Sequence, residues 1–332
     1  MKLKKKYFPG YLLKLNALGV KLVSMNGIIN IFKPKGISSY QVVREVRNIL
    51  NIPKAGHTGT LDPSASGVLL ICIGQATKIA EFLVGMKKHY RGEMILGIST
   101  DSQDSEGKII QKKKVETNID EKRIKDILRK YEGTISQTPP MFSAAHYKGK
   151  RLYHLARKGI EVKRNPKKVK IYQFKLINFN QKVNPIIKFE VICSKGTYIR
   201  TLCSDIGDEL GCGAHLSNLV RKKVGNFSIE DSINLEELKK GKALRERYLI
   251  SIDSVLEELN KITVKSEATK IVLNGGVISS EQIVEIPEGL KTRKNKFVKI
   301  FDVKDNLLSI GTLIKENGKN IFFKPVKVFK NY

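Results

Sequence analysis

The chain has 332 residues, 28% charged and 41% hydrophobic, which excludes a disordered protein and, at about 150 residues per domain, predicts about two domains. Lys and Arg number 61 against 32 Asp and Glu, and the formal net charge of +29 predicts a polyanionic partner, with nucleic acid ahead of an anionic membrane surface. No stretch approaches about 20 consecutive apolar residues, which excludes a membrane-spanning helix.

Residues 1–24 form a basic N-terminal extension with six Lys and no Asp or Glu. The segment lacks the apolar core and small-residue cleavage site of a secretory signal, and the absence of Arg argues against a transit peptide. Two interpretations stay open: a start-site artefact ahead of Met25, or a basic arm that contacts nucleic acid.

Regular elements begin at Gly27. GIINIF predicts a strand and KPKG a turn, after which Ser38 or Ser39 caps a helix. One apolar stripe of that helix consists of Val42, Val46, Ile49 and Leu50. A loop rich in Gly, Thr and Pro covers 53–67, and the apolar run GVLLICIG that follows predicts a buried strand.

The middle of the chain predicts several shorter elements. We expect a helix over 77–86, a strand over 89–99, a turn over 101–108 and a helix over 119–131. The composition then changes over 137–168, and from Lys148 to Lys170 there are ten cations and one acid.

The last third predicts strands, one clear helix and a small β domain. Strand patterns cover 169–179 and 185–193, a helix covers 199–210, and 231–260 is polar and helical in pattern. From about residue 262 short strands alternate with Gly-rich turns. Mixed strands and helices without regular βαβ alternation predict the α+β class.

Two charged residues stand out as candidates for a site. Asp62 precedes Pro63 in the Gly-rich loop before a buried strand, so it is either a turn aspartate or a carboxylate presented at the mouth of a sheet. Arg200 lies in the first turn of a helix, where the dipole disfavours a cation, so an anionic partner such as Asp62 or a phosphate is expected. An arginine fork on Asp62 would hold that carboxylate ionised and oriented. Tyr90, on a predicted strand, is by itself an ordinary half-buried tyrosine.

The sequence gives no sign of a metal or a nucleotide cofactor. The five His residues are scattered, and neither a P-loop nor a G-x-G-x-x-G motif is present. No C-x-x-C pair occurs, so we expect reduced, buried cysteines in a cytoplasmic protein at Cys72, Cys193, Cys203 and Cys212.

The segment GHTGTLDPSASGVLLICIG closely resembles the catalytic motif of the TruB family of tRNA pseudouridine synthases. The resemblance continues in order through FKPKGISS (32–39), KHYRGEMILGISTDSQDSEG (88–107), QTPPMFSAAHYKGKRLYHLARKGIEV (137–162), CSKGTYIRTLCSDIG (193–207) and GCGAHLSNLVRKKVGNF (211–227). The tail, with NGG (274–276) and FFKPVKVF (322–329), resembles a PUA domain, a small RNA-binding β-barrel. Phe32 and Val220 depart from the usual pattern, and neither lies at the expected chemistry.

The resemblance implies a role for each matching residue. Asp62 matches the catalytic aspartate and Arg200 the arginine that pairs with it. Five further residues are expected to bind the substrate. Tyr90 matches a tyrosine that stacks on the target base, and Leu219 matches an apolar residue that lines the pocket. His57 matches a histidine that contacts the T-loop, and Lys33 and Pro34 match a pair that supports the floor of the active site. Residues 137–166 match a thumb-like insertion that orders on RNA, with RNA contacts expected from Lys148, Lys150, Arg151, Arg157, Lys158, Lys163 and Arg164.

The implied fold is a largely antiparallel sheet with helices over 25–260, followed by a PUA-like barrel over 262–330. The implied activity is conversion of uridine to pseudouridine at position 55 in the T-loop of tRNA, by base flipping and an aspartate nucleophile. The implied protein is a cofactor-free monomer with no guide RNA and no membrane. Two alternatives stay open: a non-catalytic RNA chaperone, and a guide-RNA-dependent subunit, a branch that lacks the thumb-like insertion.

Overall fold

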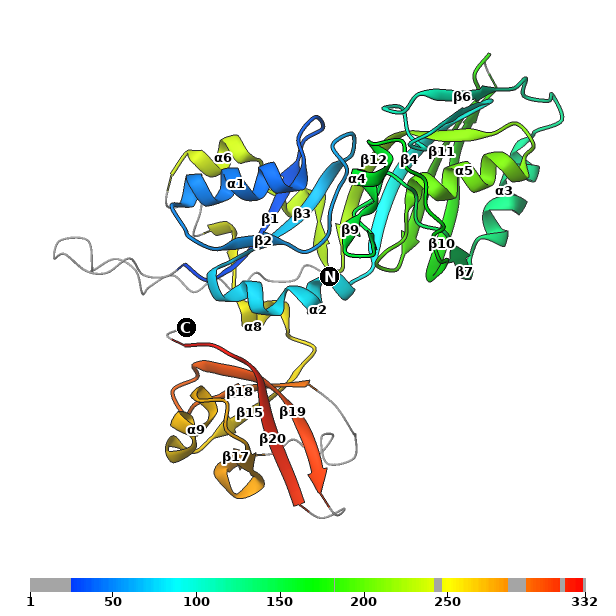
Figure 1. The fold of residues 1–332 in the computed structure, drawn as a ribbon. Coiled ribbons are helices and arrows are strands. Elements are labelled where there is room, and N and C mark those ends of the chain that lie inside the picture. The colour runs from blue at the N-terminus through cyan, green and yellow to red at the C-terminus, as the bar shows by residue number, and fades with distance from the viewer. Residues whose placement is uncertain (1–24, 182, 242–246, 286–296, 317–319, 331–332) are drawn as a thin grey trace.

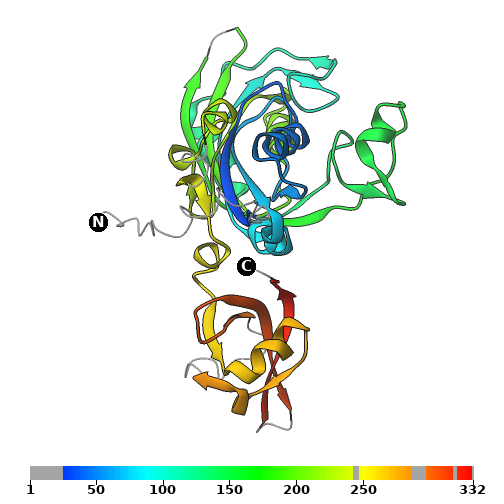
Figure 2. The same cartoon turned by 90° about the vertical axis from the view of Figure 1, so that its left-hand side faces the viewer.

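The computed structural model describes residues 25–181, 183–241, 247–285, 297–316 and 320–330, so the basic extension over 1–24 lies outside the described residues. Two β-sheets organise this part of the chain, a large one in the N-terminal three quarters and a smaller one at the C-terminal end (Figure 1). Figure 2, turned by 90°, shows the two parts as separate lobes joined near α2 and α8.

The large sheet has ten strands and is mixed but largely antiparallel, as the resemblance implied. Its main path runs β14-β1-β3-β12-β4-β11-β10-β7, and β2 and β13 pair with β3 and β12. In that order the bounds are Leu249–Ile250, Gly27–Lys33, Ser66–Ile73, Ala214–Val224, Lys88–Leu96, Ile186–Cys193, Lys167–Asn180 and Gly133–Gln137, with β2 at Ala55–His57 and β13 at Phe227–Ser228. The parallel pair is β3 with β12, which joins the two halves of the sheet. Two small hairpins accompany it, β5 (Ile98–Thr100) with β6 (Ile109–Lys112) and β8 (His146–Tyr147) with β9 (Lys150–Arg151).

Helices cover the sheet in two groups. The first comprises α1 (Ser39–Leu50) and α6 (Leu235–Lys239), which pack over β1 and β3. The second comprises α3 (Glu121–Lys130) and α5 (Ile199–Glu209), which pack over the half formed by β4, β11 and β10. Helix α1 begins as predicted, because Ser38 accepts from the Gln41 backbone and the Gln41 side chain accepts from the Ser38 backbone in a capping box. The remaining short helices are η1 (Gly74–Ile79), α2 (Ala80–Gly85), α4 (Leu152–Ala156), η2 (Ile229–Asp231) and α8 (Ile252–Val255).

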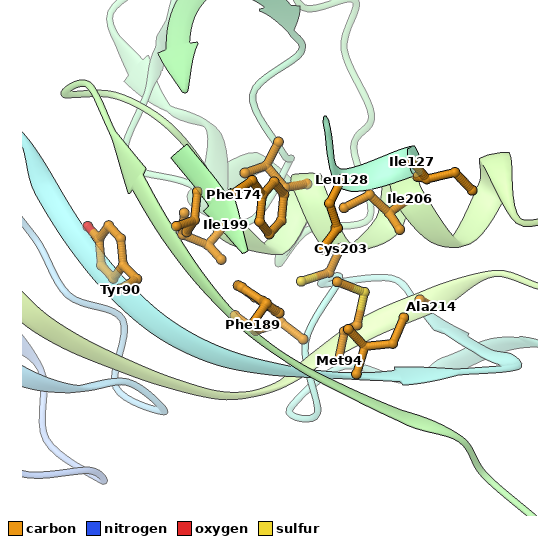
Figure 3. Close-up of a cluster of buried hydrophobic side chains, with 14 of the residues drawn as sticks. Tyr90, Met94, Ile127, Leu128, Phe174, Phe189, Ile199, Cys203, Ile206 and Ala214 are labelled. Carbon is orange, nitrogen blue, oxygen red and sulfur yellow. The ribbon is translucent and has the colours of Figure 1, made fainter. Parts of the chain in front are cut away.

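The core beneath α3 and α5 sets the position of the candidate site. Phe174 and Phe189 meet edge to face there, with ring centroids 5.3 Å apart, and Cys203 and Ile206 pack onto them from α5. Figure 3 shows Tyr90 at the end of this cluster, where β4 leaves the helices. Tyr90 therefore connects this apolar cluster to the candidate site, whose cavity it also lines.

The C-terminal lobe is a barrel-like six-stranded sheet with its own core. The strand order is β16-β20-β19-β18-β15-β17, with bounds Ile278–Ser279, Asn320–Val328, Leu307–Glu316, Phe297–Phe301, Asn260–Val264 and Ile283–Glu285. Its short helices are η3 (Ser266–Ala268), α9 (Thr269–Leu273) and η4 (Ser280–Gln282).

A second apolar cluster joins the two lobes. Phe301 and Phe329 of the C-terminal lobe share this cluster with Leu70 and Leu83 of the first lobe. The Phe82 and Phe297 rings also meet at 5.0 Å, and the Lys78 ammonium donates to the Val328 carbonyl at 2.6 Å. The C-terminal lobe is therefore packed against η1 and α2.

Three sequence predictions for the local structure need correction. The helix expected over 77–86 is a 3₁₀ turn, Gly74–Ile79, followed by α2, Ala80–Gly85. The strand expected over 89–99 breaks at Gly97, which has φ +84°, so β4 and β5 are separate. The helical segment expected over 231–260 is reduced in the described residues to short helices such as α6 and α8, because β14 pairs with β1 and draws this region into the sheet. All four cysteines are buried, as predicted.

Candidate active site

The loop between β2 and β3 presents Asp62 from a backbone that is held on several sides. The Ser39 hydroxyl accepts from the Leu61 backbone N–H at 2.8 Å and donates to the Leu61 carbonyl at 2.9 Å. The Pro63 carbonyl accepts from the Gly36 N–H at 2.9 Å and from the Lys33 ammonium at 3.3 Å. The Asp62 side chain itself is 40% exposed, so a fixed loop carries an accessible carboxylate.

Arg200, in the first turn of α5, faces that carboxylate. Its Nε lies 3.0 Å from Asp62 Oδ2, and its side chain is only 6% exposed. The ion pair between Asp62 and Arg200 predicted from the sequence is confirmed. The unfavourable helix position is offset, since the guanidinium meets anions and carbonyls instead of solvent.

The pairing is not the fork expected from the sequence, because the guanidinium nitrogens are divided among four partners. NH1 donates to the Ser102 carbonyl at 3.0 Å and lies 3.4 Å from Asp104 Oδ2, and NH2 donates to the Phe142 carbonyl at 2.9 Å. Only Nε is directed at Asp62. Arg200 therefore joins the Asp62 loop to the turn at 102–104 and to the start of the 137–166 segment.

A cavity of about 230 Å³ opens beside this pair. The loop residues 58–62 line it together with Tyr90 of β4, Leu219 of β12 and the turn at 194–199. Ser143 and Ala144 of the 137–166 segment also reach it. Apolar and aromatic side chains thus line the cavity next to the charged pair, together with the cations Lys88, Lys195 and Arg221, and such a lining can hold a flat ring while leaving Asp62 free to react.

Tyr90 and Leu219 are the buried walls of this cavity, at 8% and 7% exposure. They lie on neighbouring antiparallel strands, where Leu219 pairs with Gly92 and Tyr90 pairs with Arg221. Burial raises the pKa of the Tyr90 phenol, although the Arg221 charge acts in the opposite direction. Tyr90 is therefore a neutral phenol near neutral pH.

Lys33 supports the loop from below. Its fully buried ammonium donates to the Pro34, Ile37 and Pro63 carbonyls at 2.8, 2.7 and 3.3 Å. Burial lowers its pKa to about 8, an effect that the Asp62 charge partly opposes. Pro34 contributes its carbonyl, and its ring is exposed.

His57 does not line the cavity. It ends β2, half-buried, and its Nδ1 accepts from the Gly59 N–H at 3.4 Å. Burial, and then the Arg221 charge, lower its pKa, so it is a neutral imidazole near neutral pH.

Sequence reasoning missed several residues of the site, among them Lys88, Arg221 and Asp104. Arg221 is 2% exposed, and its guanidinium donates to the Val68, Thr60 and Gly59 carbonyls at 2.7, 3.4 and 3.0 Å. The only sequence signal for it was one arginine after the apolar pair Leu219–Val220. Asp104 lies in the segment DSQDSEG, which the sequence predicts to be a turn. Its side chain is nevertheless buried, with the residue 5% exposed, and it lies 3.4 Å from the Arg200 guanidinium.

The basic side chains predicted to contact RNA lie on a segment that reaches away from the sheet (Figure 2). Lys148, with φ +46°, occupies the turn of the β8–β9 hairpin, and Arg157 caps α4. Most of these side chains are exposed, namely Lys148, Lys150, Arg151, Arg157, Lys158 and Lys163. Arg164 differs, because it is partly buried, pairs with Glu161 at 3.1 Å and donates to the Pro139 carbonyl at 3.2 Å.

Within the described residues, no group of three or more His, Cys, Asp or Glu side chains is arranged to hold a metal ion. None of the helices in this part of the chain has the length and apolar character that a membrane crossing needs.

Comparisons with known proteins assign the chain to a class. The model of the N-terminal domain of TruB family pseudouridylate synthases matches residues 47–199, and that of the C-terminal domain of tRNA pseudouridylate synthase B matches 200–262. The chain is thus a pseudouridylate synthase of this class.

A protein of Clostridium kluyveri, named tRNA pseudouridine synthase B, is 44% identical over 92% of this chain and all of its own length. One of the same name from Alkaliphilus oremlandii is 48% identical over 79% of this chain and 85% of its own. The chain belongs to the TruB family.

A solved structure has a similar fold over most of the chain. A chain of the Cbf5–Nop10–Gar1 complex superposes with a TM-score of 0.69 at 27% identity, over 93% of this chain and 85% of that one.

Proposed function

We propose that this protein converts uridine to pseudouridine in tRNA, at position 55 of the T-loop, as a single chain without guide RNA or cofactor. The observation that carries the proposal is the ion pair at the cavity, in which a 40% exposed Asp62 carboxylate is held by a 6% exposed Arg200 guanidinium. The relatives at 44% and 48% identity, both named tRNA pseudouridine synthase B, support the choice of substrate.

The reaction is an isomerisation. The bond from C1′ to N1 of uracil breaks, a bond from C1′ to C5 forms, C5 loses a proton and N1 gains one. Nothing is oxidised or reduced, so the residues of the site suffice. We assign Asp62 as the nucleophile, and three routes use the same carboxylate: attack on C1′, assistance of a glycal-forming elimination, and attack on the pyrimidine ring.

Each proposed role follows from a contact. Arg200 orients the Asp62 carboxylate through the 3.0 Å pair. Tyr90 and Leu219 form the walls that retain the detached base while it turns. Because burial raises the phenol pKa, Tyr90 acts as a stacking face and hydrogen-bonding hydroxyl, and a phenolate base is disfavoured at neutral pH. Lys33 fixes the loop backbone at Pro63.

The target uridine must leave its stack, at a cost of a few kcal/mol. We propose that residues 25–260 form the catalytic domain, that 137–166 close on the RNA, and that 262–330 form a PUA-like RNA-binding domain. His57, behind the 58–62 loop, supports the extruded nucleotide. Phosphate contacts that offset the cost of extrusion come from Lys148, Lys150, Arg151, Arg157, Lys158, Lys163 and Arg164. Such contacts make affinity fall with salt.

An assay without other macromolecules tests the proposal. Purified protein is incubated with an unmodified T-arm hairpin transcript, and pseudouridine is mapped by carbodiimide labelling and primer extension. We expect one modified position, and no product with Asp62→Asn. Hairpin binding without product would refute the stand-alone enzyme and favour an RNA chaperone. Product only after addition of a guide RNA would favour the guide-dependent alternative.

A further inference from the structure

An exposed tyrosine on β10 carries two lysines over its ring. Tyr172 is 40% exposed, and the ammonium groups of Lys87 and Lys170 lie 4.2 and 5.3 Å from its ring centroid. In the part of the chain that the structure describes, no carboxylate within 4.0 Å pairs with either lysine. Two like charges thus lie close to one aromatic ring and no carboxylate of the described residues pairs with them, an arrangement that attracts an external anion.

The backbones of these residues lie beside the rim of the candidate active site, although Lys87, Lys170 and Tyr172 do not themselves line its cavity. Lys88 of β4 pairs with Cys193 of β11, and Cys193 pairs with Ile171 of β10. At the next position along these strands, Lys87, Ser194 and Lys170 therefore lie next to one another. Ser194 lines the cavity, its hydroxyl accepts from the Lys170 N–H at 2.9 Å, and its own N–H donates to the Lys170 carbonyl at 2.8 Å.

The next residue, Lys195, brings a further cation to this rim. It is exposed and lines the cavity together with its neighbour Ser194. Lys87 precedes Lys88, whose buried ammonium also lines the cavity. We name the group Lys87, Lys170, Tyr172 and Lys195 the β10 rim.

We propose that the β10 rim binds the phosphodiester backbone of the RNA strand next to the nucleotide that enters the cavity. The inference rests on the proposed function, because an extruded nucleotide brings its flanking phosphates to the cavity mouth. Lysines contact phosphates as point charges without reading sequence, and an exposed tyrosine offers a face on which a flanking base stacks. The β10 rim is separate in sequence from the 137–166 segment and from the C-terminal lobe, so it is an additional RNA contact.

The salt dependence of binding tests the charges. Binding of the T-arm hairpin transcript is measured over a range of salt concentrations for wild type, Lys87→Gln/Lys170→Gln and a control, Lys114→Gln/Lys122→Gln, which removes two exposed lysines near β6 and α3. We expect the slope of log K against log salt to become less negative by about 1.4–1.8 in the rim variant relative to the control. Equal slopes for the two variants would overturn the proposal, and the control variant is expected to keep a single-turnover rate at saturating hairpin within twofold of wild type.

The tyrosine is tested by two variants of different chemistry. Tyr172→Phe keeps the aromatic face and should bind the hairpin as wild type does, while Tyr172→Leu should bind several-fold more weakly with an unchanged salt slope. Equal binding by Tyr172→Leu would overturn the stacking role. Failure of the proposed function is distinguishable, since the wild type would then make no pseudouridine even if the slopes differ as expected.

Discussion

Arg200→Lys keeps the positive charge of the site but removes the three guanidinium nitrogens that contact different partners. The guanidinium serves Asp62 through Nε, Ser102 and Asp104 through NH1, and the Phe142 carbonyl through NH2. One ammonium group cannot occupy three nitrogen positions, so a lysine drawn to the buried Asp104 loses both Asp62 and Phe142.

The size of the effect follows from these two lost contacts. A hydrogen bond to a charged group contributes about 1.5–3 kcal/mol. Loss of the contact with Phe142 therefore lowers the free energy of unfolding by about 1.5–3 kcal/mol. Loss of the 3.0 Å ion pair that orients Asp62 raises the barrier by a similar amount, which slows turnover by about 13- to 160-fold.

Single-turnover rates at saturating T-arm hairpin and urea unfolding measure the two effects separately. Arg91→Lys is the matched control, because Arg91 directs Nε and NH2 at one Glu190 oxygen, at 2.9 and 2.7 Å, with its side chain 56% exposed. We expect that variant to stay within twofold of the wild-type rate, as an exposed pair contributes at most about 1 kcal/mol. An Arg200→Lys enzyme that turns over within threefold of wild type would refute the reasoning.

Three further predictions concern the nucleophile, the buried lysine and the close contact of β3 with β12. Asp62→Asn should abolish pseudouridine formation and retain hairpin binding; turnover within tenfold of wild type, a barrier change of only about 1.4 kcal/mol, would contradict the assigned role. The Lys33 pKa is lowered from 10.5 to about 8, so unfolding takes up a proton between these values and stability rises with pH across that window, by up to about 1.4 kcal/mol per pH unit. Lys33→Met should remove this part of the rise in urea unfolding at pH 8, 9 and 10, and parallel pH profiles for the two proteins would count against it. Gly67 has φ +111° and an added Cβ would lie 2.3 Å from the Arg221 carbonyl oxygen, so Gly67→Ala should lower the free energy of unfolding by about 2 kcal/mol or more. Gly85→Ala, with open space at the same atom, is the control, and equal denaturation midpoints would argue against the contact.

Local signals in the sequence determined the elements on the first half of the sheet. Ser38 with Gln41 fixes the start of α1, and the apolar run before Gly74 forms β3, all of whose residues are buried. The pairing of Asp62 with Arg200 could also be predicted from the sequence. An arginine in the first turn of a helix is disfavoured without an anionic partner, and the family resemblance identified Asp62 as that partner.

The central strand β12 escaped prediction for a physical reason. Its alternation is broken by register shifts at Leu216/Asn218 and Arg221/Lys223, and a buried charge occupies a position that the pattern would give to an apolar side chain. Arg221 is stable there only because three carbonyls on β3 and the 58–62 loop accept its donors, and these partners lie more than 150 residues earlier in the chain.

Short segments of the sequence therefore predicted which residues belong to the site, because helix capping, strand alternation and loop composition each depend on only a few neighbouring residues. Only the tertiary structure decided which partner each Arg200 nitrogen contacts, because these partners come from three separate stretches of the chain. They are Asp62, Ser102, Asp104 and Phe142. A guanidinium takes its geometry from whichever oxygens the folded chain brings within about 3 Å, and no sequence spacing encodes that distance.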